Sequence, residues 1–144
     1  MAAKNVTVVA TMGEGFKIES QIRDHAVAID QPQAAGGTDT GPTPLEYFFF
    51  SLAGCIGSIA RIMANQRRLA IRSMQVTVSG ELDMDVLLGK NTDDRAGFQG
   101  VDIKVSMVSD LSADETSAFL QEVERRCPVS DNIMSGTPVT IELE

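Results

Sequence analysis

The chain has 144 residues, of which 43% are hydrophobic and 22% charged, and its formal net charge is −8. This length and composition predict one globular domain over residues 1–144, large enough to bury a core. The negative charge argues against nucleic-acid binding, because phosphates are bound by clustered Lys and Arg. The N-terminal residues have no apolar run behind a positive start, so we expect no signal peptide and a cytoplasmic location.

The N-terminal part is expected to form an antiparallel meander. The β-branched run Asn5–Thr11 is typical of a strand, and the alternation in Phe16–Arg23 predicts a second. A third strand, His25–Asp30, follows a turn. Residues Gln31–Thr43 include two prolines and three glycines, which indicate a loop. Loops of this length are often functional, although a passive connector fits the composition equally well.

The stretch from Gly41 to about Arg68 is the centre of the chain. Pro44 suits the first turn of a helix, and the residues after it leave almost no polar face, which predicts a buried helix. Its uncharged run of 14 residues is too short to span a bilayer, so we expect no membrane partner. At roughly 37 Å the helix is about as long as the domain is wide. Because one thin sheet cannot cover it, we predict an interlaced homodimer.

Three further strands are expected after the central helix. Met74–Met84 and Val101–Val108 alternate apolar and polar residues, as half-buried strands do. Between them, Asp85–Gly100 is rich in Gly, Asn and Asp and is expected to be a solvated excursion. Thr137–Leu143 is predicted to end the chain as an edge strand.

Two shorter helices are marked by their ends. Ser112 and Glu115 have the spacing of a capping box, which starts a helix that runs to Arg126. Pro128 can open a short helix that Gly136 closes. The order of elements predicts an α+β fold in which antiparallel sheets wrap around a long buried central helix.

Most kinds of catalytic or metal site are excluded by composition. One histidine and two cysteines cannot supply the four ligands of a structural zinc site. No G-x-S-x-G elbow is present to act with His25. The pair Gly36–Gly37 is not followed by Lys-Ser/Thr, as a phosphate loop requires. The candidates that remain are Cys55 and Cys127, which are 72 residues apart.

The two cysteines have different local surroundings. Gly54 and Gly57 flank Cys55 closely enough to let a substrate or another helix approach the thiol. In mid-helix a low pKa of Cys55 would require a cationic neighbour. If Pro128 is the first helical residue, Cys127 is the N-cap, where the helix dipole favours a thiolate. Taken alone, each cysteine is equally compatible with a small buried apolar side chain.

The segments GGTDTGPTPLEYFFFSLAGC and CPVSDNIMSGTPV resemble the OsmC/Ohr family of thiol-dependent hydroperoxide reductases, and the GPTPLE form resembles its OsmC-like group. The resemblance extends from about Asp24 to the C-terminus. It implies an interlaced homodimer with two active sites at the subunit interface. It also implies that the peroxidatic thiol is Cys55, which becomes a sulfenic acid, and that Cys127 resolves it as a disulfide. An external thiol similar to dihydrolipoamide would then reduce the disulfide, without metal or cofactor.

The resemblance assigns two further site residues. An arginine from the N-terminal strands, here Arg23, would activate the thiolate, and Glu46 near the helix start would orient that arginine. Glu46 is one position later than in the hydroperoxide-resistance branch. Nine residues at about 100° each place it roughly 180° from Cys55 on an ideal helix. Contact with the site would therefore require a bend at Gly54 or the partner subunit.

The favoured hypothesis is a peroxidase that reduces organic hydroperoxides through Cys55 and Cys127. The run Phe48–Phe50 would favour alkyl substrates if it lined the site, but dimer core is the better explanation of it. The alternative is a non-catalytic dimer of the same fold that binds a small molecule or senses redox state.

Overall fold

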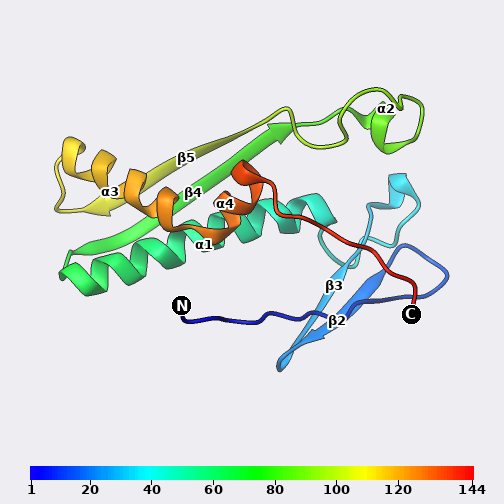
Figure 1. Cartoon of the computed structure of the whole chain (residues 1–144), viewed down its shortest axis with the longest axis horizontal. Coiled ribbons are helices and arrows are strands. Elements are labelled where there is room, and N and C mark those ends of the chain that lie inside the picture. The colour runs from blue at the N-terminus through cyan, green and yellow to red at the C-terminus, as the bar shows by residue number, and fades with distance from the viewer. The chain divides into compact units, whose positions relative to one another are not determined.

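The computed structural model describes all 144 residues, which form two compact units, Met1–Phe48 and Phe49–Glu144. The predicted α+β class is confirmed, with one three-stranded and one two-stranded antiparallel sheet. The elements in chain order are β1 (Thr11–Met12), β2 (Ile18–Ile22), β3 (His25–Ile29), the 3-10 helix η1 (Gln33–Ala35), α1 (Pro44–Arg67), β4 (Ile71–Glu81), α2 (Met84–Leu87), β5 (Gly100–Ser109), α3 (Ala113–Arg126) and α4 (Pro128–Ser135) (Figure 1).

The first unit contains the sheet β1-β2-β3. Strands β2 and β3 pair from Ile18 with Ile29 to Ile22 with His25, which confirms the predicted hairpin. Arg23 lies in the tight turn between them, with a positive φ of 53°.

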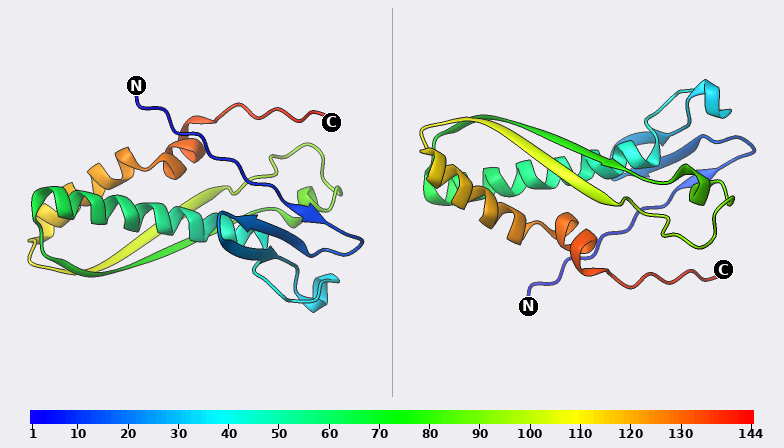
Figure 2. Two further views of the ribbon diagram at one scale, coloured as in Figure 1. Left: turned by 90° about the horizontal axis from the view of Figure 1, so that it is seen from below. Right: turned by 90° about the horizontal axis from the view of Figure 1, so that it is seen from above.

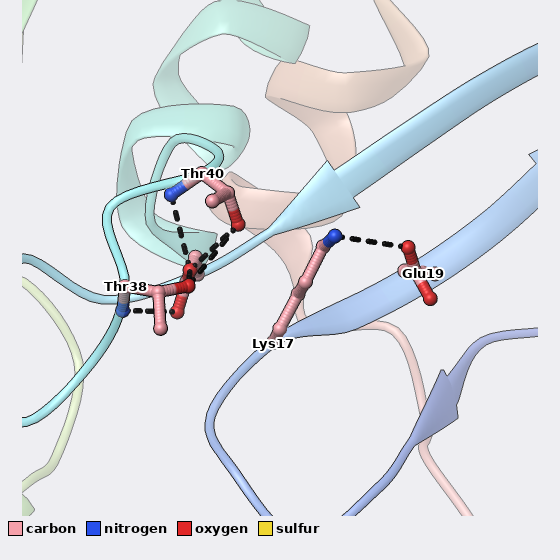
Figure 3. A network of polar contacts seen from close by, with 5 residues as sticks. Lys17, Glu19, Thr38 and Thr40 are labelled. Atoms are coloured by element: carbon pink, nitrogen blue, oxygen red, sulfur yellow. Dashed lines mark hydrogen bonds and ion pairs between the residues drawn. The ribbon is translucent and has the colours of Figure 1, made fainter.

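A buried carboxylate organises the loop after β3. Asp30 is 1% exposed and accepts hydrogen bonds from the backbone N–H groups of Gln31 (2.8 Å), Thr38 (3.4 Å) and Thr40 (3.0 Å). The Thr38 and Thr40 hydroxyls donate to the same carboxylate at 2.5 and 2.8 Å (Figure 3). Hydrogen bonds from Thr38, Thr40 and Gln31 together outweigh burial and hold the pKa of Asp30 far below its usual value.

The same loop packs backbone against backbone at two glycines. A Cβ atom at Gly37 would lie 2.1 Å from the carbonyl oxygen of Gln31, and one at Gly41 would lie 2.4 Å from that of Ala28. Both distances are far below van der Waals contact, so only glycine fits there. The loop is therefore an ordered structure and not a passive connector.

Helix α1 begins and ends close to where the sequence predicts. Pro44 is its first residue, and Arg68 follows its last residue with a φ of 55°. The N–H of Leu69 donates to the carbonyl of Ala64 at 2.8 Å, the bond that closes a Schellman motif. Arg68 thus occupies the left-handed position that glycine usually fills.

The second unit places α1 beside the β4–β5 hairpin and α3, as the two views of Figure 2 show. The hairpin pairs from Ile71 with Ser109 to Glu81 with Gly100, which confirms both predicted strands. One stripe of α1 enters the core, with residues at the spacing expected of a single helix face. The core consists of Leu52, Ile56, Ala60, Met63 and Ala64 of α1 together with Ile71, Phe119, Val123 and Cys127.

The opposite side of α1 remains uncovered in a single chain. Phe50 is 73% exposed and Ile62 is 45% exposed. The sequence predicts a helix that is buried nearly all round, whereas one chain supplies cover for one stripe only. By length and composition alone, α1 could also cross a membrane, a property that core helices of soluble proteins share.

Two predicted strands are absent. Of Asn5–Thr11, only Thr11 lies in a strand, and Thr137–Leu143 forms no regular element. Both segments have the β-branched or alternating residues of strands, but a strand also requires a neighbour for its backbone hydrogen bonds. Within one chain neither segment has a partner that forms such a ladder with it.

Candidate active site

The structure brings the two cysteines together across 72 residues of sequence. Cys55 lies in the middle of α1, and Cys127 lies at the junction of α3 and α4. Their sulfur atoms are 2.8 Å apart in hydrogen-bonding contact, and both are free thiols. Because the bonded S–S distance is about 2.05 Å, a small movement would join them.

Local sequence signals position Cys127. The capping box of Ser112 and Glu115 starts α3 as predicted, and the helix ends at Arg126. Pro128 is the first residue of α4, so Cys127 is its N-cap, which confirms the sequence prediction. The Cys127 sulfur accepts a hydrogen bond from the backbone N–H of Ser130 at 3.4 Å.

The two sulfurs differ in their access to solvent. Cys127 is 0% exposed and belongs to the hydrophobic core, whereas Cys55 is only partly buried. Partly buried apolar side chains, among them Ile59 and Val129, pack against the same core. A ligand would therefore reach the pair from the side of Cys55.

Burial sets the protonation of Cys55. It raises the pKa of the Cys55 thiol, and the contact with Cys127 raises it further. Hydrogen bonding by the backbone amide of Val129 acts in the opposite direction. None of these groups is cationic, so the pair as it stands in this chain favours the protonated thiol.

The largest apolar groove of the second unit is separate from the thiols. It has a volume of about 420 Å³ and lies between β5 and α3, with Val101, Leu120 and Glu124 among its lining residues. Ile56, the neighbour of Cys55, lines it, but neither cysteine does.

The other two predicted site residues belong to the first unit. Arg23 is exposed in the β2–β3 turn. Glu46 is used at the start of α1, where its carboxylate accepts from the Thr43 N–H at 2.7 Å and its own N–H donates to the Thr43 hydroxyl at 3.3 Å. This is the reciprocal arrangement of a capping box. The predicted roles of Arg23 and Glu46 at the thiols stay predictions.

Sequence reasoning missed the backbone amides that face the sulfurs. The amides of Val129 and Ser130 follow from the N-cap position of Cys127, because an N-cap side chain accepts from the second or third residue of the helix. The carboxylate of Asp30 was also left without a role, since no short motif marks a group whose donors are eight and ten residues away.

A family model described as OsmC-like protein matches residues 37–142. The chain belongs to the OsmC family. The matched range of this OsmC-family chain includes Glu46, Cys55 and Cys127 but not Arg23. A search of curated proteins found no match.

Solved structures of the family share the fold at low sequence identity. An OsmC-like protein from Mycoplasma pneumoniae is 21% identical with a TM-score of 0.81, and the alignment covers 94% of this chain and 91% of that one. An organic hydroperoxide resistance protein OsmC from Legionella pneumophila is 21% identical, with a TM-score of 0.67 and coverage of 94% and 93%. A putative organic hydroperoxide resistance protein from Vibrio cholerae, with captopril in one of its active sites, is 15% identical, with a TM-score of 0.65 and coverage of 93% and 88%.

Proposed function

We propose that this OsmC-family chain is a thiol-dependent peroxidase that reduces organic hydroperoxides through Cys55 and Cys127. The observation that carries the proposal is the 2.8 Å contact between a partly exposed sulfur and a fully buried one. Relatives of the same fold are named as organic hydroperoxide resistance proteins, which supports this substrate class.

The two thiols account for the chemistry without a bound cofactor. The Cys55 thiolate attacks the terminal oxygen of the hydroperoxide, the O–O bond breaks, and the alkoxide takes a proton and leaves as an alcohol. Cys55 is then a sulfenic acid. The Cys127 sulfur attacks it, water leaves, and a Cys55–Cys127 disulfide forms. Two equivalents of an external thiol, similar to dihydrolipoamide, return the pair to the reduced state and become a disulfide themselves.

The thiolate requires a positive charge that the second unit does not supply. Because burial raises the pKa of Cys55, little thiolate forms at neutral pH without such a charge. We assign this role to Arg23, oriented by Glu46, from the same chain or from a partner. Arg23→Lys keeps a charge but loses the planar fork that can hold both sulfur and peroxide oxygen. It should therefore slow peroxide reduction more than it changes unfolding by urea.

The functional unit in this proposal is a cytoplasmic homodimer in which the exposed side of α1 packs against a second copy. Small residues, including Gly54 and Ser58, lie beside the exposed aromatic and aliphatic side chains of this side. Small side chains let two helices approach closely. The same contact would cover Phe50, so the FFF run serves the dimer core more than a substrate pocket.

One observation favours a second function. A thiol whose pKa is raised reacts slowly with peroxide, as expected of a dimer that binds a small molecule or senses redox state without catalytic turnover. Such a protein would leave hydroperoxide unreduced in a multiple-turnover assay, or would release a partner upon oxidation.

Cumene hydroperoxide tests the peroxidase directly. One equivalent added to the reduced protein should remove two hydrogens within seconds and link tryptic peptides 24–61 and 127–144. Cys55→Ser should abolish peroxide consumption, whereas Cys127→Ser should permit one turnover and block the second. An unchanged mass after minutes, or multiple turnovers by Cys55→Ser, would contradict the proposal.

A further inference from the structure

The oxidised pair offers an incoming thiol two sulfurs that are not equivalent. Cys127 is 0% exposed and lies within the core beside Phe119 and Val123, whereas Cys55 is partly open. Attack on a disulfide requires approach along the S–S axis, behind the sulfur that is attacked. Behind Cys127 lies the packed core, so only Cys55 can be approached without opening the fold.

The leaving sulfur is also distinguished by its surroundings. Thiol–disulfide exchange is faster when the departing sulfur is stabilised as a thiolate. The Cys127 sulfur already accepts the Ser130 N–H at 3.4 Å and lies at the N-terminus of α4, an eight-residue helix whose dipole favours negative charge there. Cys55 lies within α1, where backbone N–H groups of its own helix are used in the helical bonds.

We propose that the external thiol attacks the sulfur of Cys55 and that Cys127 departs as a thiolate held by the Ser130 N–H. The inference rests on the proposed function, whose reductive half it describes. In this step the incoming thiolate forms an S–S bond with Cys55, and the electron pair of the old disulfide goes to Cys127. A second equivalent of thiol attacks the external sulfur of the mixed disulfide and releases Cys55 as a thiolate, ready for the next hydroperoxide.

The order of events gives α4 a role in turnover. Cys127 alternates between a resolving nucleophile and a leaving group, and both states are thiolates that gain from the same N–H group and helix dipole. The reductant therefore enters by the opening that the hydroperoxide uses, and the two substrates compete for Cys55. A high concentration of external thiol should consequently inhibit peroxide consumption competitively only through Cys55.

The test identifies which peptide carries the mixed disulfide. The full-length protein is oxidised with one equivalent of cumene hydroperoxide and, in parallel, with diamide, which forms disulfides without peroxidase chemistry. A brief pulse of 2-mercaptoethanol is quenched with acid, free thiols are blocked with N-ethylmaleimide, and tryptic peptides are analysed by mass. Peptide 24–61 should carry mercaptoethanol and peptide 127–144 should carry maleimide at the shortest times.

The two oxidants separate the possible failures. Mercaptoethanol on peptide 127–144, or comparable amounts on both peptides at the shortest times, would overturn the inference. A disulfide that forms with diamide but not with hydroperoxide would remove the proposed function and still report the direction of attack. Failure of diamide to link the peptides would overturn both, because the sulfurs would not pair.

Single-cysteine variants provide a second measurement. Reduced Cys127→Ser, which retains Cys55, should react with 5,5′-dithiobis(2-nitrobenzoate) at least about tenfold faster than Cys55→Ser, which retains the buried thiol. Urea unfolding of both variants serves as the control, since a destabilised protein would expose Cys127. Equal rates in two equally stable variants would show that Cys127 is accessible and would contradict the inference.

Discussion

Replacing Phe50 by Ala tests whether α1 packs against a second copy of the chain. In the isolated chain Phe50 is 73% exposed, so the truncation removes little buried area and should change the free energy of unfolding by about 0.5 kcal/mol. If a partner covers the ring, each chain loses about 2 kcal/mol of buried apolar surface. A symmetric dimer loses this twice, so its dissociation constant should rise about a thousandfold.

Sedimentation equilibrium over a wide range of concentrations measures that dissociation constant. Leu87→Ala is a matched control, because Leu87 is also an exposed apolar side chain, at 56%, but lies on α2. It should leave the dissociation constant unchanged. A wild-type protein that is monomeric at all concentrations, or a Phe50→Ala variant that dimerises as tightly as wild type, would refute the reasoning.

Two predictions concern stability. Hydrogen bonds from the Thr38 hydroxyl and its neighbours hold the pKa of Asp30 below its ordinary 3.8, so the stability they add is present above about pH 4 and is lost as the pH falls through the lowered pKa. Urea unfolding should therefore show wild type losing its advantage over Asp30→Asn in acid, and parallel pH profiles would contradict this. Arg68→Gly should raise the free energy of unfolding by about 1 kcal/mol, because it relieves a left-handed residue, whereas Gln66→Gly within the helix should lower it by about as much. Destabilisation by Arg68→Gly would show that the arginine side chain matters more than its backbone strain.

Signals that act within a few residues were read correctly from the sequence. Pro44 starts α1, Ser112 and Glu115 cap α3, and Pro128 makes Cys127 the N-cap of α4. Each of these depends on groups at most four residues apart, whose geometry the backbone of a helix determines. The alternation of β4 and β5 was equally readable, because each strand has its partner in the same chain.

Tertiary structure decided whatever depends on distant groups. Asn5–Thr11 and Thr137–Leu143 have strand-like sequences but form no ladder, because pairing depends on a neighbour and not on propensity. Spacing alone could not show that the sulfurs of Cys55 and Cys127 meet at 2.8 Å, or that only Cys55 faces the solvent. The sequence by itself determined the helices, their caps and the two thiols. The packing of α1 against α3 determined that the thiols touch, because side chains far apart in sequence meet only when an apolar stripe is buried.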